Sequence, residues 1–412
     1  MNTLVDAGFP AASDRDPPEC RSIDMDAVRA YRLGRVRSEL AARDVAAIVL
    51  TDPLNVRYAT DSTNMQVWIT HNAARYAFIP VDGPVVMFDF HNSGHRSAGL
   101  DTVDEIRHGT GIYYFASGPA MTERADRWAR EIGDLLRHCG GSNRRLAIDR
   151  ANPVAIAALQ ELGLEIRDGT EIMELARVIK SDDEIQCMRA SIAVCEAAMY
   201  EMRTRLAPGM TENALWSILH QVNIARGGEW IETRLLTSGP KTNPWFQESG
   251  FRVIEAGDLV SFDTDLIGPF GYCADISRTY LCGDDRANDE QRRLYALARE
   301  HLDFNAESLK PGMTFREFAE KSFRLPDEFG ANRYSVIAHG VGLCDEYPHI
   351  AYPGDLLDHG YDGVIEPGMT LCIESYVGAQ GGAEGVKLEQ QVLVTDTGVE
   401  LLSTFPFEES LL

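Results

Sequence analysis

Two acidic residues directly follow a short apolar segment near the middle of the chain. The segment reads Leu-Val-Ser-Phe over positions 259–262, and Asp263 and Asp265 come next. Alternate residues of a strand share a face, so the two carboxylates should lie about 6–7 Å apart on one side. A glycine-rich turn at 268–271 predicts a hairpin that returns Asp275 beside them. Converging carboxylates repel one another and lose hydration, and a bound cation removes both penalties, so this stretch predicts a metal site.

The C-terminal half contains a weak internal repeat that adds further carboxylates. Pro-Gly-Met-Thr occurs at 208–211 and again at 311–314, each time before a predicted helix. A turn that feeds an apolar strand ending in an acid also occurs twice, at 255–263 and at 366–374. With 63 acidic residues in the chain, one such match arises easily by chance, but two matches in the same order favour a functional pairing. Two related halves then supply two carboxylates each to one site: Asp263 and Asp275, and Glu374 and Glu389.

A single histidine, His339, lies between the two acid pairs in the sequence Ile-Ala-His-Gly-Val-Gly-Leu. Such a histidine is more often structural than a ligand, but the glycines beside it allow close approach of the backbone. Oxygen ligands with one imidazole are typical of dinuclear sites for hard or borderline divalent ions, such as manganese, iron, cobalt, nickel or zinc. The sequence has no cluster for four-thiolate or three-histidine zinc chemistry.

Composition places the chain among ordinary globular proteins, with 44% hydrophobic and 25% charged residues over 412 positions. Its net charge of −24 argues against nucleic acid or an anionic membrane as a partner. The eight cysteines contain no Cys-x-x-Cys pair, which is typical of reduced intracellular thiols. No apolar run approaches 18 residues, and the first residues lack the layout of a signal peptide. We therefore expect a cytoplasmic protein with a poorly ordered arm at 1–22.

The first half alternates predicted strands and helices, which indicates an α/β domain. The predicted helices are 22–44, 120–138 and 153–162. The predicted strands are 45–50 and 145–149, and a turn is expected at 51–53. A further pair of strands, 76–80 and 85–89, is predicted to form a hairpin. The character of the sequence changes at 177–185, where Ser181 and Glu184 form a capping box ahead of a long helix that ends near Arg205. The predicted domains are 23–175 and 176–412.

The ordered set Asp263, Asp275, His339, Glu374 and Glu389 resembles the metal ligands of the creatinase/prolidase family. The sequences Gly-Tyr-x-x-Asp-Ile-Ser-Arg-Thr around Asp275 and His-Gly-Val-Gly-Leu at His339 carry the resemblance, as do 52–58 and 177–185 in the first half. It covers about residues 25–405. The resemblance implies an α+β fold, in which a creatinase-like α/β domain precedes a pita-bread domain with an internal pseudo-two-fold repeat. It also implies two divalent metal ions and a homodimer.

Three departures from the family's peptidases concern the chemistry. Trp245 and Phe246 stand in the segment where those peptidases carry a histidine, and Cys344 to Pro348 lack the second histidine that follows His-Gly-x-Gly-Leu. Both histidines act on the scissile amide in the peptidases, so their absence disfavours peptide hydrolysis. The usual glycine two residues after the first metal aspartate is replaced by Asp265, which adds a negative ligand.

The segments 61–68, 227–236, 243–247 and 262–268 resemble the dimethylsulfoniopropionate lyases of this family. That resemblance implies a metal-dependent elimination that gives dimethyl sulfide and acrylate from a small zwitterion. It further implies two metal ions, iron foremost, and a dimer in which the partner's N-terminal domain lies near the site.

We expect Asp345 to be the base that removes the α-proton, because it replaces the proton shuttle of the peptidases and an acid-rich pocket should raise its pKa. Tyr334 could position the substrate, and aromatic faces attract sulfonium cations, so Trp68, Trp230 and Trp245 are further candidates. For Asp345 the alternative is a solvated loop residue, and for the aromatic residues it is core packing. Two other functions stay open: a hydrolase such as an Xaa-Pro dipeptidase or a creatinase-like enzyme, and a binding module without catalysis.

Overall fold

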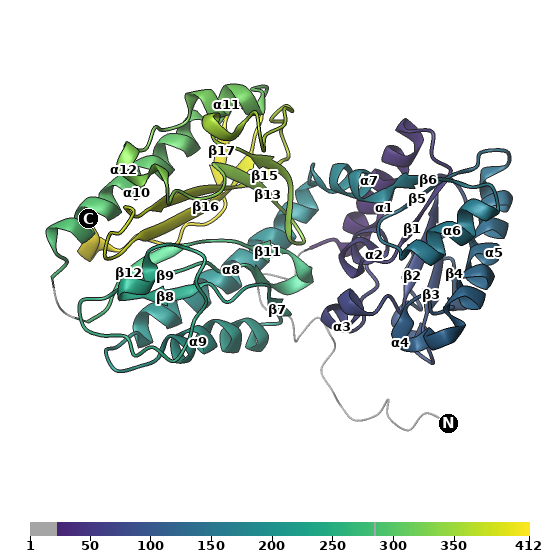
Figure 1. Cartoon of the computed structure of the whole chain (residues 1–412), viewed down its shortest axis with the longest axis horizontal. Helices are drawn as coiled ribbons and strands as arrows, with labels where there is room; N and C mark the ends of the chain where they lie inside the picture. The colour runs from purple at the N-terminus through teal and green to yellow at the C-terminus, as the bar shows by residue number, and fades with distance from the viewer. Residues whose placement is uncertain (1–22, 284–285) are drawn as a thin grey trace. The chain divides into compact units, whose positions relative to one another are not determined.

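The computed structural model describes residues 23–283 and 286–412, which form two compact units, Asp24–Arg177 and Val178–Leu412 (Figure 1). The sequence placed the domain boundary at about residue 175. The arm predicted at 1–22 lies outside the described residues. Each unit has its own sheet and its own hydrophobic core.

The N-terminal unit is a six-stranded sheet with helices on both faces (Figure 1). Its strand order is β4-β3-β2-β1-β5-β6, with the bounds β1 Ala47–Leu50, β2 Tyr76–Pro80, β3 Val86–Asp89, β4 Glu105–His108, β5 Arg145–Ile148 and β6 Glu165–Asp168. Its α-helices are α1 Met25–Ala42, α2 Pro53–Thr60, α3 Gln66–His71, α4 Tyr114–Ser117, α5 Met121–Gly140, α6 Pro153–Glu161 and α7 Gly169–Arg177. The predicted hairpin is confirmed by the antiparallel pairing of β2 with β3.

Several elements of this unit were not predicted, among them helices α3, α4 and α7, and for the two edge strands and the start of α2 the physical reason is clear. Strands β4 and β6 are the two edges of the sheet, and their residues are mostly exposed and polar, so no apolar pattern marks them. The predicted turn at 51–53 begins a helix instead. The Asp52 carboxylate accepts a hydrogen bond of 2.8 Å from the Leu54 amide, and Pro53 fits the first turn of α2 because it has no amide hydrogen to satisfy.

The C-terminal unit consists of two related halves, as the repeat predicted. The first half contains α8 Asp182–Arg205, α9 Glu212–Ala225, β7 Trp230–Ile231, β8 Leu236–Ser238, β9 Leu259–Phe262, β10 Leu266–Ile267, β11 Cys273–Ala274 and β12 Arg278–Leu281. The second half contains α10 Asp289–Ser308, α11 Phe315–Lys321, α12 Asp327–Gly330, β13 Ala338–Val341, β14 Asp345–Ile350, β15 Thr370–Val377, β16 Val386–Val394 and β17 Val399–Leu401.

Equivalent positions of the two halves form equivalent contacts. Thr211 caps α9 and forms a β-bridge with Val253, and Thr314 caps α11 and forms a β-bridge with Val364. The predicted capping box at the start of α8 is confirmed, because Ser181 and Glu184 exchange backbone-to-side-chain hydrogen bonds of 3.0 and 3.2 Å. The fold class predicted from the sequence is therefore confirmed, together with the internal repeat.

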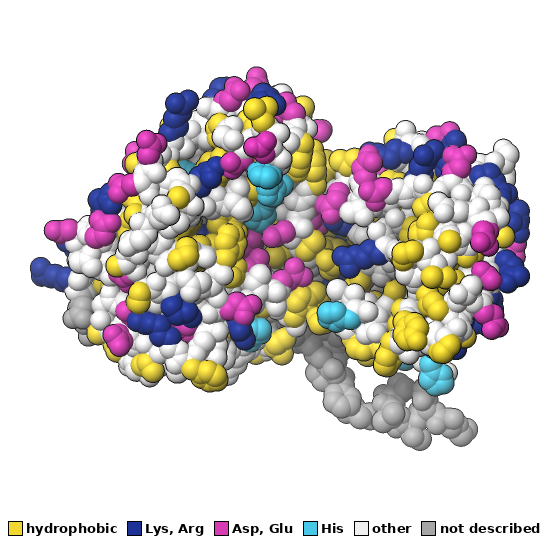
Figure 2. Space-filling view, in the orientation of Figure 1, with side chains coloured by type: hydrophobic (Ala, Val, Ile, Leu, Met, Phe, Trp, Pro, Cys, Tyr) yellow, Lys and Arg dark blue, Asp and Glu magenta, His cyan; other side chains and the backbone are white. Residues whose placement is uncertain are grey.

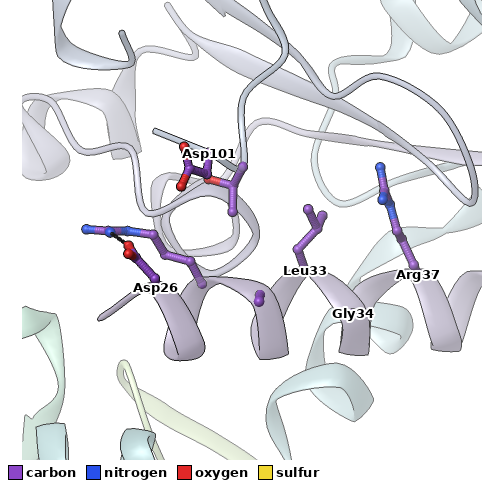
Figure 3. A pocket seen from close by; sticks show the side chains of 8 residues that line it. Asp26, Leu33, Gly34, Arg37 and Asp101 are labelled. Atoms are coloured by element: carbon purple, nitrogen blue, oxygen red, sulfur yellow. Dashed lines mark hydrogen bonds and ion pairs between the residues drawn. The ribbon is translucent and has the colours of Figure 1, made fainter. Parts of the chain in front are cut away.

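Surface features bear on which partners the chain could take. On the face shown in Figure 2, basic side chains lie among acidic ones and do not gather into one patch. A hollow of about 490 Å³ along α1, lined by Leu33, Gly34 and Arg37 among others (Figure 3), includes none of the residues predicted for the site. Of the helices in the described ranges, none combines the length and apolar character that crossing a bilayer requires. None of the seven described cysteines forms a disulfide.

A buried arginine ties together the strands that support the centre of the C-terminal unit. Arg278 on β12 is 1% exposed, and burial lowers the pKa of its guanidinium to about 10. All five of its N–H donors have acceptors. The acceptors are the carbonyls of Ser277, Glu389, Phe405 and Pro406 and the side-chain oxygen of Gln390, at 2.7–3.4 Å. Arg278 thereby fixes β16 against β12 and the C-terminal segment.

We expect Arg278→Lys to lower the free energy of unfolding by about 2–4 kcal/mol, because a lysine has three donors and leaves buried carbonyls without partners. Urea unfolding of the purified protein measures the change. Arg299→Lys is the matched control, because Arg299 stacks on the same Phe407 ring as Arg278 but pairs with Asp303 at the surface. It should cost less than about 1 kcal/mol. Equal effects of the two substitutions would contradict the role given to Arg278.

Candidate metal centre

The second half contributes one face of a β-sheet to the centre. Strand β13 places His339 directly opposite Cys372 of β15, and β15 places Glu374 directly opposite Glu389 of β16. Cys372 and Glu374 are two residues apart in the same strand, so their side chains share that face. Strand register therefore brings His339, Glu374 and Glu389 together from three neighbouring strands.

The first half contributes three aspartates from the region between β9 and β12. The predicted hairpin is confirmed, because β10 pairs antiparallel with β11 and returns Asp275 beside the others. The expected strand alternation of Asp263 and Asp265 is wrong, since β9 ends at Phe262. Asp265 instead has a left-handed backbone, with φ of 36°, and its carboxylate accepts a hydrogen bond of 2.5 Å from the Thr233 hydroxyl. This local turn aims Asp265 at its neighbours.

All six predicted metal ligands lie in one group, which we call the carboxylate cluster: Asp263, Asp265, Asp275, His339, Glu374 and Glu389. Three overlapping sets of side chains each have ligand atoms within 4.8 Å of one another. The sets are Asp263, Asp265 and Asp275; Asp263, Glu374 and Glu389; and Asp275, His339, Cys372 and Glu389. The sets overlap, with Asp263, Asp275 and Glu389 each in two of them, so these residues together could hold more than one ion.

The donor atoms of the cluster fit a metal ion. Among the described residues, Asp275 Oδ1 and Glu389 Oε1 are buried and accept no hydrogen bond. His339 Nε2 lies 3.4 Å from Glu374 Oε1 and 3.7 Å from both Asp275 Oδ2 and Glu389 Oε1. Burial and neighbouring carboxylates raise the pKa of Asp275 and Glu389 well above the ordinary value. A divalent cation would satisfy these oxygens and remove that penalty.

Lys387 is a member of this centre that the sequence reasoning missed. Its ammonium lies 2.8 Å from Glu374 Oε2 and 3.1 Å from both Asp263 Oδ2 and Glu389 Oε2, and its side chain is fully buried. Burial alone would lower the pKa of Lys387, but these three carboxylates raise it well above the ordinary value. Strand alternation is the signal that could have found it, since Lys387 precedes Glu389 by two residues in β16.

Ser277 links the two halves of the cluster through its hydroxyl group. Its Oγ lies 2.6 Å from Asp263 Oδ1 and 2.7 Å from Glu389 Oε2, and Lys387 donates to it at 2.6 Å. The hydroxyl carries a single proton, so the two carboxylates share it. Burial raises the pKa of Asp263, but the Lys387 charge and these hydrogen bonds lower it overall. Lys387 and these hydrogen bonds therefore hold Asp263 in its ionised form.

Asp345 and Tyr334 lie at the border of the cluster. Asp345 Oδ1 is 3.7 Å from His339 Nδ1, and 59% of the Asp345 side chain is exposed. Partial desolvation is the largest influence on the pKa of Asp345, which is raised despite the nearby His339. The Tyr334 ring contacts Phe246, with 5.2 Å between ring centroids, and the Lys387 ammonium lies 4.6 Å from the Tyr334 centroid.

The three predicted tryptophans have different surroundings. Trp245 is buried, lies 6.0 Å from the Tyr376 ring, and has the Lys387 ammonium 5.7 Å from its ring centroid, so it borders the cluster. Trp230 is on β7 and donates to Glu232 at 3.3 Å, and its contacts with the described residues do not place it at the cluster. Trp68 belongs to α3 of the other unit, where it is 37% exposed beside Phe90.

Comparison with known proteins gives matches for both units. The profile of metallopeptidase family M24 matches residues 186–396, and that of the creatinase/prolidase N-terminal domain matches 32–179. The chain is 45% identical to dimethylsulfoniopropionate lyase DddP of Roseovarius nubinhibens and 44% identical to that of Roseobacter denitrificans. Each alignment covers 94% of this chain and 88% of the relative.

Solved structures share the fold at lower identity. An Xaa-Pro dipeptidase from Bacillus anthracis superposes with a TM-score of 0.74 at 22% identity, over 92% of this chain and 99% of that chain. The prolidase from Pyrococcus horikoshii superposes with a TM-score of 0.72 at 19% identity, over the same shares. At these identities the likeness concerns the fold and not the reaction.

We expect Lys387→Met to destabilise the metal-free protein by about 3–5 kcal/mol, because three buried carboxylates lose their counter-charge. Added divalent metal should restore part of that loss, so the metal should raise the melting temperature of the variant more than that of the wild type. Thermal unfolding with and without a chelator measures both. Lys321→Met, at an exposed position, should leave both values unchanged. If metal raises the melting temperature of Lys387→Met no more than that of the wild type, Lys387 is not the counter-charge of the carboxylate cluster.

Proposed function

The chain belongs to metallopeptidase family M24, and we propose that within it the chain is a dimethylsulfoniopropionate lyase. The observation that carries the proposal is the 45% identity to a dimethylsulfoniopropionate lyase over 94% of the chain, which spans both units. The site supports the same conclusion, because the two segments in which the family's peptidases carry histidine contain none here, and Trp245 and Asp345 of these segments border the carboxylate cluster. Trp245 and Phe246 occupy one such segment, and Cys344 and Asp345 the other.

The carboxylate cluster would hold two divalent ions, with iron our first expectation and manganese, cobalt, nickel or zinc the alternatives. Such ions would supply positive charge against the substrate carboxylate, and thereby make its α-hydrogen more acidic. The side chains contribute five carboxylates and one ammonium, a net charge of −4 when all are ionised, which two divalent cations balance. Lys387 therefore sets how much negative charge the cluster presents.

Asp345 would take the proton from the carbon next to the substrate carboxylate. The C–H electron pair then forms the double bond of acrylate, and the bond from the β-carbon to sulfur breaks with its electron pair leaving on dimethyl sulfide. Asp345 lies beside the cluster, where the substrate carboxylate would be bound. Its side chain is also 59% exposed, so the proton can pass to water after each turnover. Its raised pKa makes it a stronger base than an ordinary aspartate once ionised.

Aromatic side chains would hold the sulfonium end of the substrate. Burial is the main reason that the pKa of Tyr334 is raised well above its ordinary value, so its phenol stays neutral. The Lys387 ammonium already lies 4.6 Å from the Tyr334 centroid and would repel a second cation there. We therefore propose that Tyr334 positions the substrate through its hydroxyl, and that Phe246, which is 57% exposed beside it, offers the free aromatic face. Trp245 and Trp230 remain candidates for this role.

A homodimer would complete the site, as the family resemblance implies. Helix α3 exposes Trp68 and Val67, and its N-cap residue Met65 is exposed beside them. Met65 and Val67 are 50% and 57% exposed, so this segment presents an apolar surface to a partner. We propose that Trp68 of one protomer closes the site of the other. We also propose a cytoplasmic location, where the described cysteines stay reduced.

The direct test compares two substrates with the purified, metal-loaded protein. Headspace dimethyl sulfide with stoichiometric acrylate from dimethylsulfoniopropionate supports the lyase. Free proline from a Gly-Pro dipeptide supports the alternative, an Xaa-Pro dipeptidase. The absence of both products supports a binding module without catalysis.

Asp345→Asn should lower kcat for dimethyl sulfide release by about 10²–10⁴-fold, the usual contribution of a general base. The bound metal should be unchanged, because Asp345 borders the cluster and is not counted among its ligands. Gas chromatography and metal analysis measure the two quantities. Asp362→Asn, a surface change in the same unit, is the control. Retention of full kcat by Asp345→Asn would reject Asp345 as the base.

Asp265→Gly should reduce the metal bound per chain and lower lyase activity, because the cluster loses one carboxylate. The fold should not suffer, since the φ of 36° at this position suits glycine better than aspartate. Metal analysis, thermal unfolding and the lyase assay separate these effects. A variant with full metal and full activity would show that Asp265 is an incidental acid.

A further inference from the structure

A hydrogen-bonded side-chain amide anchors the segment 243–246, which borders the carboxylate cluster. The amide belongs to Asn243, the first residue of the segment, and is buried. Its four polar contacts are the carbonyls of Ala379 and Gly382, which accept from Nδ2 at 2.8 and 3.0 Å, and Asn332 Nδ2 and the Tyr376 hydroxyl, which lie 2.9 and 3.0 Å from Oδ1. Four contacts are the full capacity of a carboxamide, so Asn243 is held from three other parts of the chain.

The loop 378–385, between β15 and β16, leaves room for this amide by means of glycine. A Cβ atom at Gly378 would lie 2.8 Å from Asn243 Oδ1, which is too close for a carbon atom. A Cβ atom at Gly385 would overlap the Tyr376 hydroxyl group. Both positions therefore exclude larger residues for steric reasons, and the loop can pack directly on Asn243.

Phe246 lies three residues after Asn243 and has an unfavourable backbone conformation. Its φ is 64°, in the left-handed region that bulky side chains rarely adopt. Its ring is 57% exposed, and its centroid lies 5.2 Å from that of the Tyr334 ring. A residue persists in such a conformation only when its surroundings fix the backbone, and Asn243 supplies a restraint of that kind.

An exposed aromatic residue in a loop commonly has no role, and the residue that anchors the loop then serves stability alone. Two observations favour a role here. The Phe246 ring meets Tyr334, whose own ring lies 4.6 Å from the Lys387 ammonium. The preceding residue, Trp245, is buried with the same ammonium 5.7 Å from its ring centroid. The segment thus follows the border of the cluster and leaves one aromatic face open beside it.

We propose that Asn243 is a positioning residue that fixes Phe246 beside Tyr334, and that this restraint sets how tightly the protein binds the cationic end of a small sulfonium acid. The inference rests on the proposed function and deepens it. The face of an aromatic ring attracts a sulfonium cation. A ring that is already fixed loses less conformational freedom when the cation binds, so the restraint strengthens binding of the substrate and of the transition state alike. Asn243 therefore affects KM and not kcat.

Asn243→Ala should raise KM for dimethylsulfoniopropionate about three- to tenfold, the range that one partly exposed cation–π contact supplies, and should leave kcat and bound metal unchanged. Headspace dimethyl sulfide at graded substrate concentrations measures both constants. Asn305→Ala is the matched control, because Asn305 on α10 is also a buried amide that holds another segment, through the Phe323 amide at 2.8 Å. The control should lower the melting temperature and leave KM unchanged. An unchanged KM in Asn243→Ala, or an equal rise in Asn305→Ala, overturns the proposal.

A double variant tests whether Asn243 acts through the Phe246 ring. Phe246→Leu removes the aromatic face, so Asn243→Ala added to it should raise KM by no more than about twofold further. If the two single effects multiply in the double variant, Asn243 does not act through Phe246 and the proposal is overturned. Asn332→Ala removes one donor to the amide, and takes the place of Asn243→Ala in both comparisons if that variant does not fold.

Calorimetric titration with dimethylsulfonioacetate provides a measurement that does not depend on turnover. This sulfonium acid has no β-carbon and cannot undergo the elimination. Its Kd for the metal-loaded protein should rise in Asn243→Ala and in Phe246→Leu by the factors expected for KM, and should rise no further in the double variant. That pattern in a protein that releases no dimethyl sulfide would reject the lyase and keep the positioning role. Release of dimethyl sulfide with KM and Kd unchanged in Asn243→Ala would do the reverse.

Discussion

Mutual repulsion among five buried carboxylates is the constraint on which the C-terminal unit depends. Asp263, Glu374 and Glu389 each lie within 3.1 Å of one ammonium, Lys387, and without compensation such a group would take up protons or come apart. The Lys387 ammonium supplies one positive charge inside the cluster, and the Ser277 hydroxyl is shared between two of the carboxylates. The geometry of the cluster also suits bound metal cations. Stability and function therefore have the same electrostatic origin here.

The pseudo-two-fold repeat explains how so many acids reach one place. Each half presents an antiparallel strand pair, and neither half alone has enough ligand atoms for two ions. The halves also differ, because the first places its aspartates beyond the ends of short strands, whereas the second places His339, Glu374 and Glu389 within a continuous sheet. A regular sheet is a rigid support, and the irregular first half gives Asp265 its own direction.

Much of this arrangement could be predicted from the sequence, because four of the acids recur in the same order in the two halves and His339 stands in a glycine-rich segment between them. The repeat, the capping box and both hairpins follow from local patterns. The supporting residues could not be predicted in the same way. Arg278 begins strand β12 and Ser277 directly precedes it, and the partners of both are set by register between segments over 100 residues apart. The strand alternation predicted for Asp265 was wrong, because β9 ends at Phe262, three residues before Asp265, and Asp265 has a left-handed backbone.

The hydrogen bonds that join Arg278 to β16 and to the C-terminal segment affect when the centre can assemble while the chain is being synthesised. Two of the acceptors of Arg278 are the carbonyls of Phe405 and Pro406, and its guanidinium stacks on Phe407 at 4.2 Å. The support that Arg278 gives to the strand carrying Glu389 is therefore complete only after that segment has left the ribosome, although most of the ligands emerge well before it. Assembly of the centre is thus a late step, and metal delivered to the nascent chain would meet an unfinished site.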